Sequence, residues 1–246
     1  MRNGLARNNG GYMNKSVSTL GYILFFMTIA LPIGTLASFF SGYCFELISY
    51  RTVSAVIALL ALACAVLSLV MKDELRSKIS SVLYILSAPL SLLNMLFYMF
   101  KCPSVIVGAC MFIYFLCCCY LCVKHGKIKP LKLTAVIISA SLAIPVFLLS
   151  LIFIVFGNIG QNTVTNSAVS PNGYYTAEVI DSDQGALGGD TLVKVYENTE
   201  VNAIIFKIFK RPQTVYFGNW GEAKNMQMYW KDNSHLVINS VEFLIE

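Results

Sequence analysis

The sequence predicts a membrane α-helical bundle of five transmembrane helices, followed by a small C-terminal antiparallel all-β domain. Five apolar runs up to residue 156 are each long enough to cross a bilayer core of about 30 Å. After residue 166 the chain changes to short β-branched and aromatic runs separated by turn residues. Only 13% of the residues are charged and the mean hydropathy is +0.66, whereas a soluble domain is roughly 25% charged.

The predicted elements begin with a polar, irregular cytoplasmic tail at residues 1–16. The five spans cover residues 17–45, 53–71, 79–100, 104–123 and 133–156. The last span, Leu133–Phe156, contains no ionisable side chain and fits a transmembrane helix most clearly. The first run also has features of a cleaved signal peptide, with Gly34–Ala37 as a weak cleavage site, but it continues well past that site.

Basic residues predict the orientation of the spans. If the N-terminus is inside, only Arg51 and Lys101 lie in outer loops. Ten basic residues then lie in inner segments: Arg2, Arg7, Lys15, Lys72, Arg76, Lys78, Lys124, Lys127, Lys129 and Lys132. This bias places the C-terminal domain outside the cytoplasm. The basic residues flank apolar runs, so they indicate a lipid bilayer as the partner and not nucleic acid.

The C-terminal part consists of a linker rich in Gly, Asn and Thr at residues 157–166 and a β domain at residues 167–246. Turn residues such as Lys231–Ser234 separate the predicted strands. These strands are Tyr174–Ile180, Thr191–Tyr196, Ala203–Phe209, Thr214–Phe217, Met226–Trp230 and Leu236–Ile238. A domain of this size is near the lower limit for an independent core, so its aromatic residues are expected to matter for packing.

Two segments of this domain carry a resemblance. Ser170–Tyr175 (SPNGYY) and Tyr229–Ile238 (YWKDNSHLVI) resemble the two ends of one β-propeller blade. Ala177–Asp190 (AEVIDSDQGALGGD) is similar to a segment of an uncharacterised Gram-positive bacterial membrane-protein family. The resemblance implies a domain of unknown function in a bacterial cell membrane. Because one blade cannot close a propeller, it also implies a single open sheet.

A glycine-rich turn in the β domain is the predicted ligand or partner surface. Its candidate residues are Asp181, Asp183, Gln184 and Asp190, together with Trp220 and Trp230. The oxygen ligands would suit calcium, but their spacing does not fit the EF-hand loop. A solvated turn between two strands explains the same composition, so no metal or other cofactor is predicted.

Cysteines provide two further candidates. Cys44 and Cys102 are both predicted at the outer membrane surface, where a disulfide would persist if the Cα atoms lie within about 7 Å. Four cysteines, Cys117, Cys118, Cys119 and Cys122, cluster at the inner end of the fourth span. Only Cys118 and Cys122 share a helix face, so packing is the simpler explanation than metal binding or acylation.

No catalytic motif appears, and the sequence predicts a protein that is not an enzyme. Ser234 and His235 are adjacent and Asp232 is nearby, but a triad requires convergence in space. The expected function is to present the outer β domain for binding or sensing a protein, ligand or envelope component. The alternative is a transport or export accessory, or an immunity-type protein, whose helices carry the function. A polar cavity near Pro89, Asn94 and Pro145 would favour that alternative.

Overall fold

The computed structural model describes residues 2–70, 78–157, 160–185 and 188–245. The chain forms two compact units. The helical unit contains residues 1–34 and 49–156, and the β unit contains residues 35–48 and 157–246. The β unit is therefore discontinuous, because it includes the end of the first helix and the segment that connects it to the second helix.

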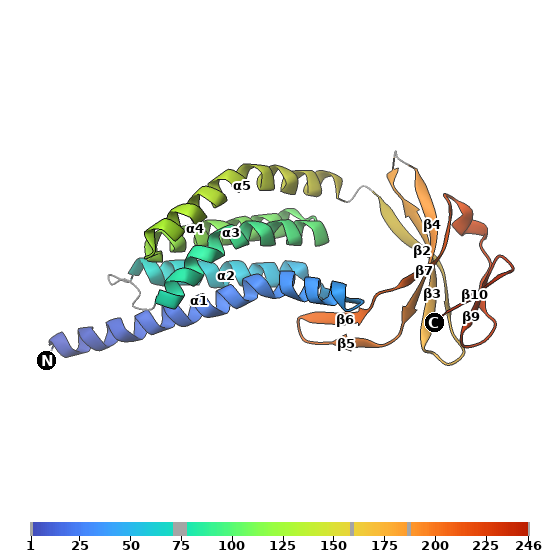
Figure 1. The fold of residues 1–246 in the computed structure, drawn as a ribbon, viewed down its shortest axis with the longest axis horizontal. Helices are drawn as coiled ribbons and strands as arrows, with labels where there is room; N and C mark the ends of the chain where they lie inside the picture. The colour runs from blue at the N-terminus through green and yellow to red at the C-terminus, as the bar shows by residue number, and fades with distance from the viewer. Residues whose placement is uncertain (1, 71–77, 158–159, 186–187, 246) are drawn as a thin grey trace. The chain divides into compact units, whose positions relative to one another are not determined.

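Five helices account for the apolar part of the chain (Figure 1). They are α1 (Arg2–Phe40), α2 (Tyr50–Val70), α3 (Lys78–Lys101), α4 (Val105–His125) and α5 (Lys129–Phe156). Each has a segment long and apolar enough to cross a membrane, which in α1 is Val17–Phe40. The predicted set of five apolar helices is thus confirmed.

Two boundaries of the helical part differ from the prediction. Residues 2–16, expected to be irregular, form the first part of α1. The first apolar helix ends at Phe40, and the following residues form a strand instead of continuing the span to residue 45. Of the residues between the second and third predicted spans, 72–78, all but Lys78 lie outside the described residues.

Small residues allow the helices to pack closely. α3 packs against α4 and α5, and α2 packs against α4. The buried side of α2 carries Ser54, Ala58, Ala61 and Ala65, which fits the small-residue contact edge typical of membrane helix pairs. By contrast, α5 exposes most of its large apolar side chains, as a lipid-facing helix would.

The β unit contains three antiparallel sheets. The first sheet has the order β1-β6-β5, the second β2-β3-β4-β7 and the third β10-β9-β8. We call them sheets A, B and C. Their strands are β1 (Tyr43–Leu47), β2 (Gln161–Val169), β3 (Tyr175–Asp183), β4 (Gly189–Glu197), β5 (Glu200–Asn202), β6 (Phe206–Lys210), β7 (Gln213–Asn219), β8 (Met228–Trp230), β9 (His235–Ile238) and β10 (Val241–Leu244).

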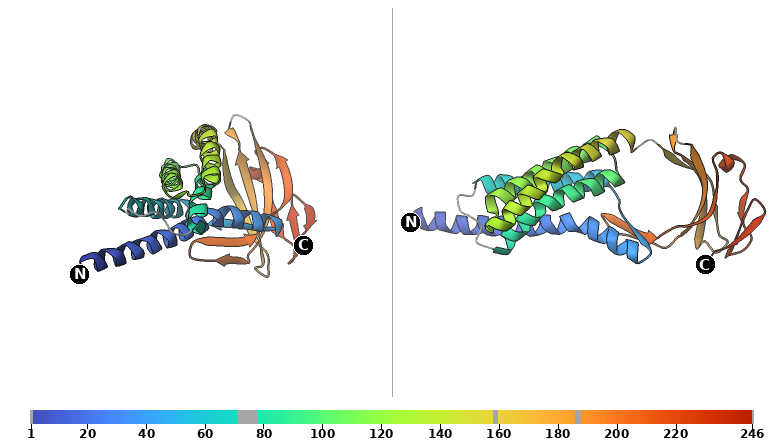
Figure 2. Two further views of the ribbon diagram at one scale, coloured as in Figure 1. Left: turned by 60° about the vertical axis from the view of Figure 1, so that its left-hand side comes forward. Right: turned by 45° about the horizontal axis from the view of Figure 1, so that its top comes forward.

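Sheets B and C pack face to face around the core of the β unit (Figure 2). Val179 of β3 and Val193 of β4 lie under Leu236 and Ile238 of β9, all with almost no exposed surface. Because side chains alternate along a strand, the residues next to Val179 and Val193 lie on the opposite face of sheet B. The single open sheet implied by the blade resemblance is therefore replaced by two packed layers and a separate sheet A.

One strand of sheet A, β1, belongs to the connection between α1 and α2. Phe45 pairs with Ile208 and its ring lies 5.1 Å from that of Phe206. The Ile48 N–H donates to the Ile205 carbonyl at the far end of the ladder. The sequence also did not predict β2, whose residues fall within and just after the expected linker, nor the short strands β5 and β10. The predicted strand Ala203–Phe209 is wrong in its first part, because residues 203–205 belong to the β5–β6 turn.

Candidate functional site

A groove in the β unit carries both charged and aromatic side chains. It has a volume of about 490 Å³ and lies between the outer face of sheet B and sheet A. Its lining residues are Thr176 and Glu178 from β3, Tyr196 and Glu197 from β4, Asn198 from the following turn, Glu200 from β5, and Lys207 and Phe209 from β6.

Strand register positions these side chains. Thr176 faces Tyr196 across the β3–β4 ladder, and Glu178 is two residues further along β3. Because Ala177 and Val179 point into the core, alternation turns Thr176 and Glu178 toward the groove. The Thr176 hydroxyl donates to Asn198 Oδ1 at 2.9 Å, which ties β3 to the turn that leads into β5.

The groove is acidic. Three glutamates line it against one lysine, Lys207, and that lysine already forms an ion pair of 3.4 Å with Glu46 of β1. Burial, and then the neighbouring Glu178 carboxylate, raise the pKa of the Tyr196 hydroxyl. Tyr196 is therefore a neutral hydroxyl donor over the physiological range, and Glu178 is its acceptor.

Glu197 anchors the other side of the groove. Its carboxylate contacts the Lys210 ammonium and accepts a hydrogen bond of 3.2 Å from the Tyr174 hydroxyl. The hydrogen bond with Glu197 raises the pKa of Lys210 and also that of Tyr174. Glu178 and Glu200 have no such cationic partner among the described contacts.

The predicted acidic turn is only partly gathered into one place. Gln184 Nε2 donates to Asp190 Oδ2 at 2.8 Å, and Asp183 Oδ1 accepts from the Gly185 N–H at 2.7 Å. Strand alternation puts Asp181 with the core-facing residues of β3, whereas Asp190 lies on the opposite face of sheet B. Ala186 and Leu187, which complete this turn, lie outside the described residues.

The two predicted tryptophans lie in different places. Trp220 packs against the backbone of Gly189, beside the acidic turn, and is 56% exposed. Trp230 stacks on Tyr175 at 5.9 Å, at the opposite end of β3, and its indole N–H donates to Ala168 O at 3.0 Å. Trp220 is thus available to a ligand, while Trp230 joins the two segments that carry the blade resemblance.

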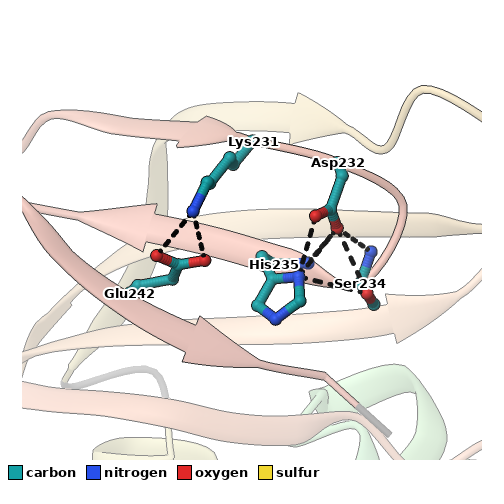
Figure 3. Close-up of polar contacts among 5 residues, drawn as sticks. All are labelled: Lys231, Asp232, Ser234, His235 and Glu242. Atoms are coloured by element: carbon teal, nitrogen blue, oxygen red, sulfur yellow. Dashed lines mark hydrogen bonds and ion pairs between the residues drawn. The ribbon is translucent and has the colours of Figure 1, made fainter.

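The Asp232, Ser234 and His235 cluster does not form a nucleophilic triad (Figure 3). Both Asp232 carboxylate oxygens lie within 2.9 Å of His235 Nδ1, and the Ser234 hydroxyl approaches the same nitrogen at 3.3 Å. A triad histidine faces its acid and its nucleophile with different ring nitrogens. Another carboxylate of the β unit, Glu222, accepts hydrogen bonds from the Tyr216 hydroxyl and from Asn219 Nδ2.

This cluster stabilises the β8–β9 turn. Asp232 Oδ1 accepts the backbone N–H groups of Ser234 and His235, each at 2.8 Å. These hydrogen bonds, and the one with the His235 ring, hold the pKa of Asp232 well below its usual range. Next to it, Lys231 contacts both carboxylate oxygens of Glu242 on β10 (Figure 3).

The cysteine candidates lie in both units of the chain. Cys44 lies on β1 in the β unit and Cys102 follows α3 in the helical unit, so their pairing stays a prediction. Cys118 and Cys122 are both fully buried on α4, in keeping with a shared helix face. Within the described residues, no three His, Cys, Asp or Glu side chains could hold a metal ion together.

Polar groups near Asn94 form hydrogen bonds in the interior of the helical unit. Asn94 Nδ2 donates to the Thr28 carbonyl at 2.7 Å, and the Thr28 hydroxyl contacts that of Tyr114. A cavity of about 160 Å³ lies among α3, α4 and α5, with Phe115, Val136 and Ser139 in its lining. Its lining is largely apolar, unlike the polar path expected of a transporter.

The structure thus defines a two-unit protein in which five apolar helices carry an antiparallel β unit with an acidic groove. No protein-family model, curated protein or solved structure matches the chain.

Proposed function

We propose that this is a non-enzymatic polytopic membrane protein whose β unit lies outside the cytoplasm and binds a ligand carrying positive charge. The helices anchor the unit in a bacterial cell membrane, with the N-terminus in the cytoplasm. The distribution of basic residues along the chain supports this orientation. The observation that carries the binding function is the groove between sheets A and B.

The chemistry of the groove suggests the ligand class. Glu178 and Glu200 are carboxylates without a cationic partner among the described ion pairs, so they are available to an ammonium or guanidinium group. The ring of Tyr196 lies in the same lining, and aromatic faces also attract such groups. The Phe209 ring shows this contact within the chain, because the Lys207 ammonium lies 5.0 Å from its centroid. A basic peptide or polyamine is therefore the class that this groove would accept.

Binding of a fluorescent oligolysine peptide to the full chain tests this function. The protein would be placed in nanodiscs of zwitterionic lipid, so that the bilayer itself does not attract the peptide. We expect Glu178→Gln to weaken binding about tenfold, because a hydrogen bond to a charged group contributes about 1.5–3 kcal/mol. Glu242→Gln is the matched control, since Glu242 lies on sheet C outside the groove.

The proposal would be wrong if the peptide showed no saturable binding, or if both substitutions weakened it equally. The alternative function, a transport or export accessory or an immunity-type protein, places activity in the helices. The contacts of Asn94 Nδ2 and of the Thr28 and Tyr114 hydroxyls lie within the bundle and support the anchoring role. Asn94 Oδ1, which is buried without a hydrogen-bond partner among the described residues, is the exception.

A further inference from the structure

The turn between β5 and β6 has an unusual composition. Ala203 donates its backbone N–H to the Phe206 carbonyl at 2.8 Å, so Ile204 and Ile205 form a two-residue hairpin loop. Such loops normally contain Gly, Asn or Asp, which adopt turn conformations easily. Two β-branched apolar residues at this position have no conformational advantage.

A second hairpin in the same unit shows the usual solution. The β9–β10 loop consists of Asn239 and Ser240, both with positive φ angles of 48° and 71°. Neither Ile204 nor Ile205 adopts a positive φ. The two loops therefore differ in chemistry: the β9–β10 loop is polar, whereas the β5–β6 loop consists of two isoleucines.

The apolar tip contributes little to packing. Ile204 is 96% exposed, Ile205 is 51% exposed and Val201, on β5, is 66% exposed. An exposed isoleucine side chain lacks the stabilisation that burial provides, which is about 0.8 kcal/mol for each methylene group removed from water. The fold itself therefore gives no reason for isoleucine at these positions.

Chain connectivity places this tip at the end of an apolar helix. Ile205 accepts a hydrogen bond of 3.0 Å from the Ile48 N–H, and Ile48 precedes the first residue of α2, Tyr50, by two positions. Two extended residues span about 7 Å at most. If α2 crosses the bilayer, the tip lies at the level of the membrane surface.

The other end of β1 carries aromatic residues. Phe39 and Phe40 close α1 and Tyr43 begins β1, and all three are exposed. Tyrosine is enriched at membrane–water interfaces because its ring is apolar and its hydroxyl is polar, and phenylalanine contributes to the apolar faces of interfacial segments. Arg211 lies over the Phe39 ring at 4.6 Å and donates to the Phe39 carbonyl at 3.1 Å, which holds sheet A against the end of α1.

We propose that the Ile204–Ile205 tip inserts into the outer interface of the same lipid bilayer that holds the helices. Sheet A then rests on the membrane surface and fixes one wall of the acidic groove, since Glu200, Lys207 and Phe209 belong to its hairpin. This inference rests on the proposed membrane anchoring but not on the ligand of the groove.

Photocrosslinking of the full chain in phospholipid nanodiscs tests the insertion. p-Benzoylphenylalanine would replace Ile204, and in separate proteins Ile144 of α5 or Val241 of β10. Ile144 is 70% exposed and serves as the position facing lipid, while Val241 is 57% exposed and lies next to the polar hairpin. All three sites are exposed, so the replacements leave the fold intact.

We expect a mass shift of one phospholipid after irradiation at positions 204 and 144, and none at 241. Adding Ile205→Asp should reduce the lipid adduct at 204 several-fold, because a carboxylate resists entry into the interface. Lipid adducts at 144 but not at 204, or adducts of 204 with protein alone, would overturn the insertion and leave the anchoring intact. Absence of lipid adducts at 144 and 204 together would overturn both.

Discussion

Replacing Glu46 with proline should destabilise the β unit by removing a bond between β1 and β6. Arg211 donates its N–H to Gly42 O, and Ile48 donates to Ile205 O. Hydrogen-bonded pairs alternate along an antiparallel ladder, so the Glu46 N–H also points at β6, toward its register partner Lys207. Proline has no N–H and leaves that acceptor unpaired.

The size of the effect follows from the lost contact. A ladder hydrogen bond contributes about 0.5–1.5 kcal/mol and an unsatisfied acceptor costs about 1–3 kcal/mol, so we expect Glu46→Pro to lower the free energy of unfolding by about 2–4 kcal/mol. Glu46→Ala is the matched control. It keeps the N–H and removes only the partly exposed ion pair with Lys207, a loss of about 0–1 kcal/mol.

Tryptophan fluorescence during denaturant unfolding measures this difference in the full chain. Both tryptophans, Trp220 and Trp230, belong to the β unit, so their emission follows this unit and not the helices. Equal midpoints and slopes for Glu46→Pro and Glu46→Ala would refute the pairing of β1 with β6. The discontinuous β unit would then be incorrect.

Three further predictions concern the core and turns of the β unit. Leu236→Ala, at a fully buried position, should cost about 2–5 kcal/mol in the same unfolding assay, and a loss no greater than that of exposed Leu244→Ala would contradict the packed core. Gly189→Ala should shift the emission of Trp220, because its new Cβ would lie 2.6 Å from the indole; an unchanged spectrum would argue against that contact. The lowered pKa of Asp232 stabilises the fold above the usual carboxyl pKa of about 3.9 and loses this contribution as pH falls toward the lowered value. Thermal melts below about pH 5 should therefore fall more steeply for the native protein than for Asp232→Asn, and parallel curves would exclude this role.

The apolar helices were predictable because length and composition alone define them. The strands that the sequence missed lack those signals. β1 follows directly after an apolar run, and Tyr43–Leu47 is itself apolar enough to be taken as the end of the span. β2 has the sequence QNTVTNSAV. It is an edge strand of sheet B, where polar residues are common, and this composition is also that of a linker.

The groove depends on register and could not be found from sequence. Glu178 and Tyr196 lie near one another only because of the register of β3 and β4, in which Tyr196 pairs with Thr176. Lys207 belongs to a different sheet. Composition did identify the acidic turn and the exposed Trp220. The expected packing role of the aromatic residues holds for Trp230, but composition could not give its partners, since Tyr175 and Ala168 are distant in sequence.

The side of the membrane on which the β unit lies is the central claim, and a pair of fusions after Glu246 measures it directly. Alkaline phosphatase folds only outside the cytoplasm and β-galactosidase is active only inside it. The account predicts an active phosphatase fusion and an inactive galactosidase fusion in intact bacterial cells. The opposite pattern would place the groove and the Ile204–Ile205 tip in the cytoplasm and contradict the proposed function.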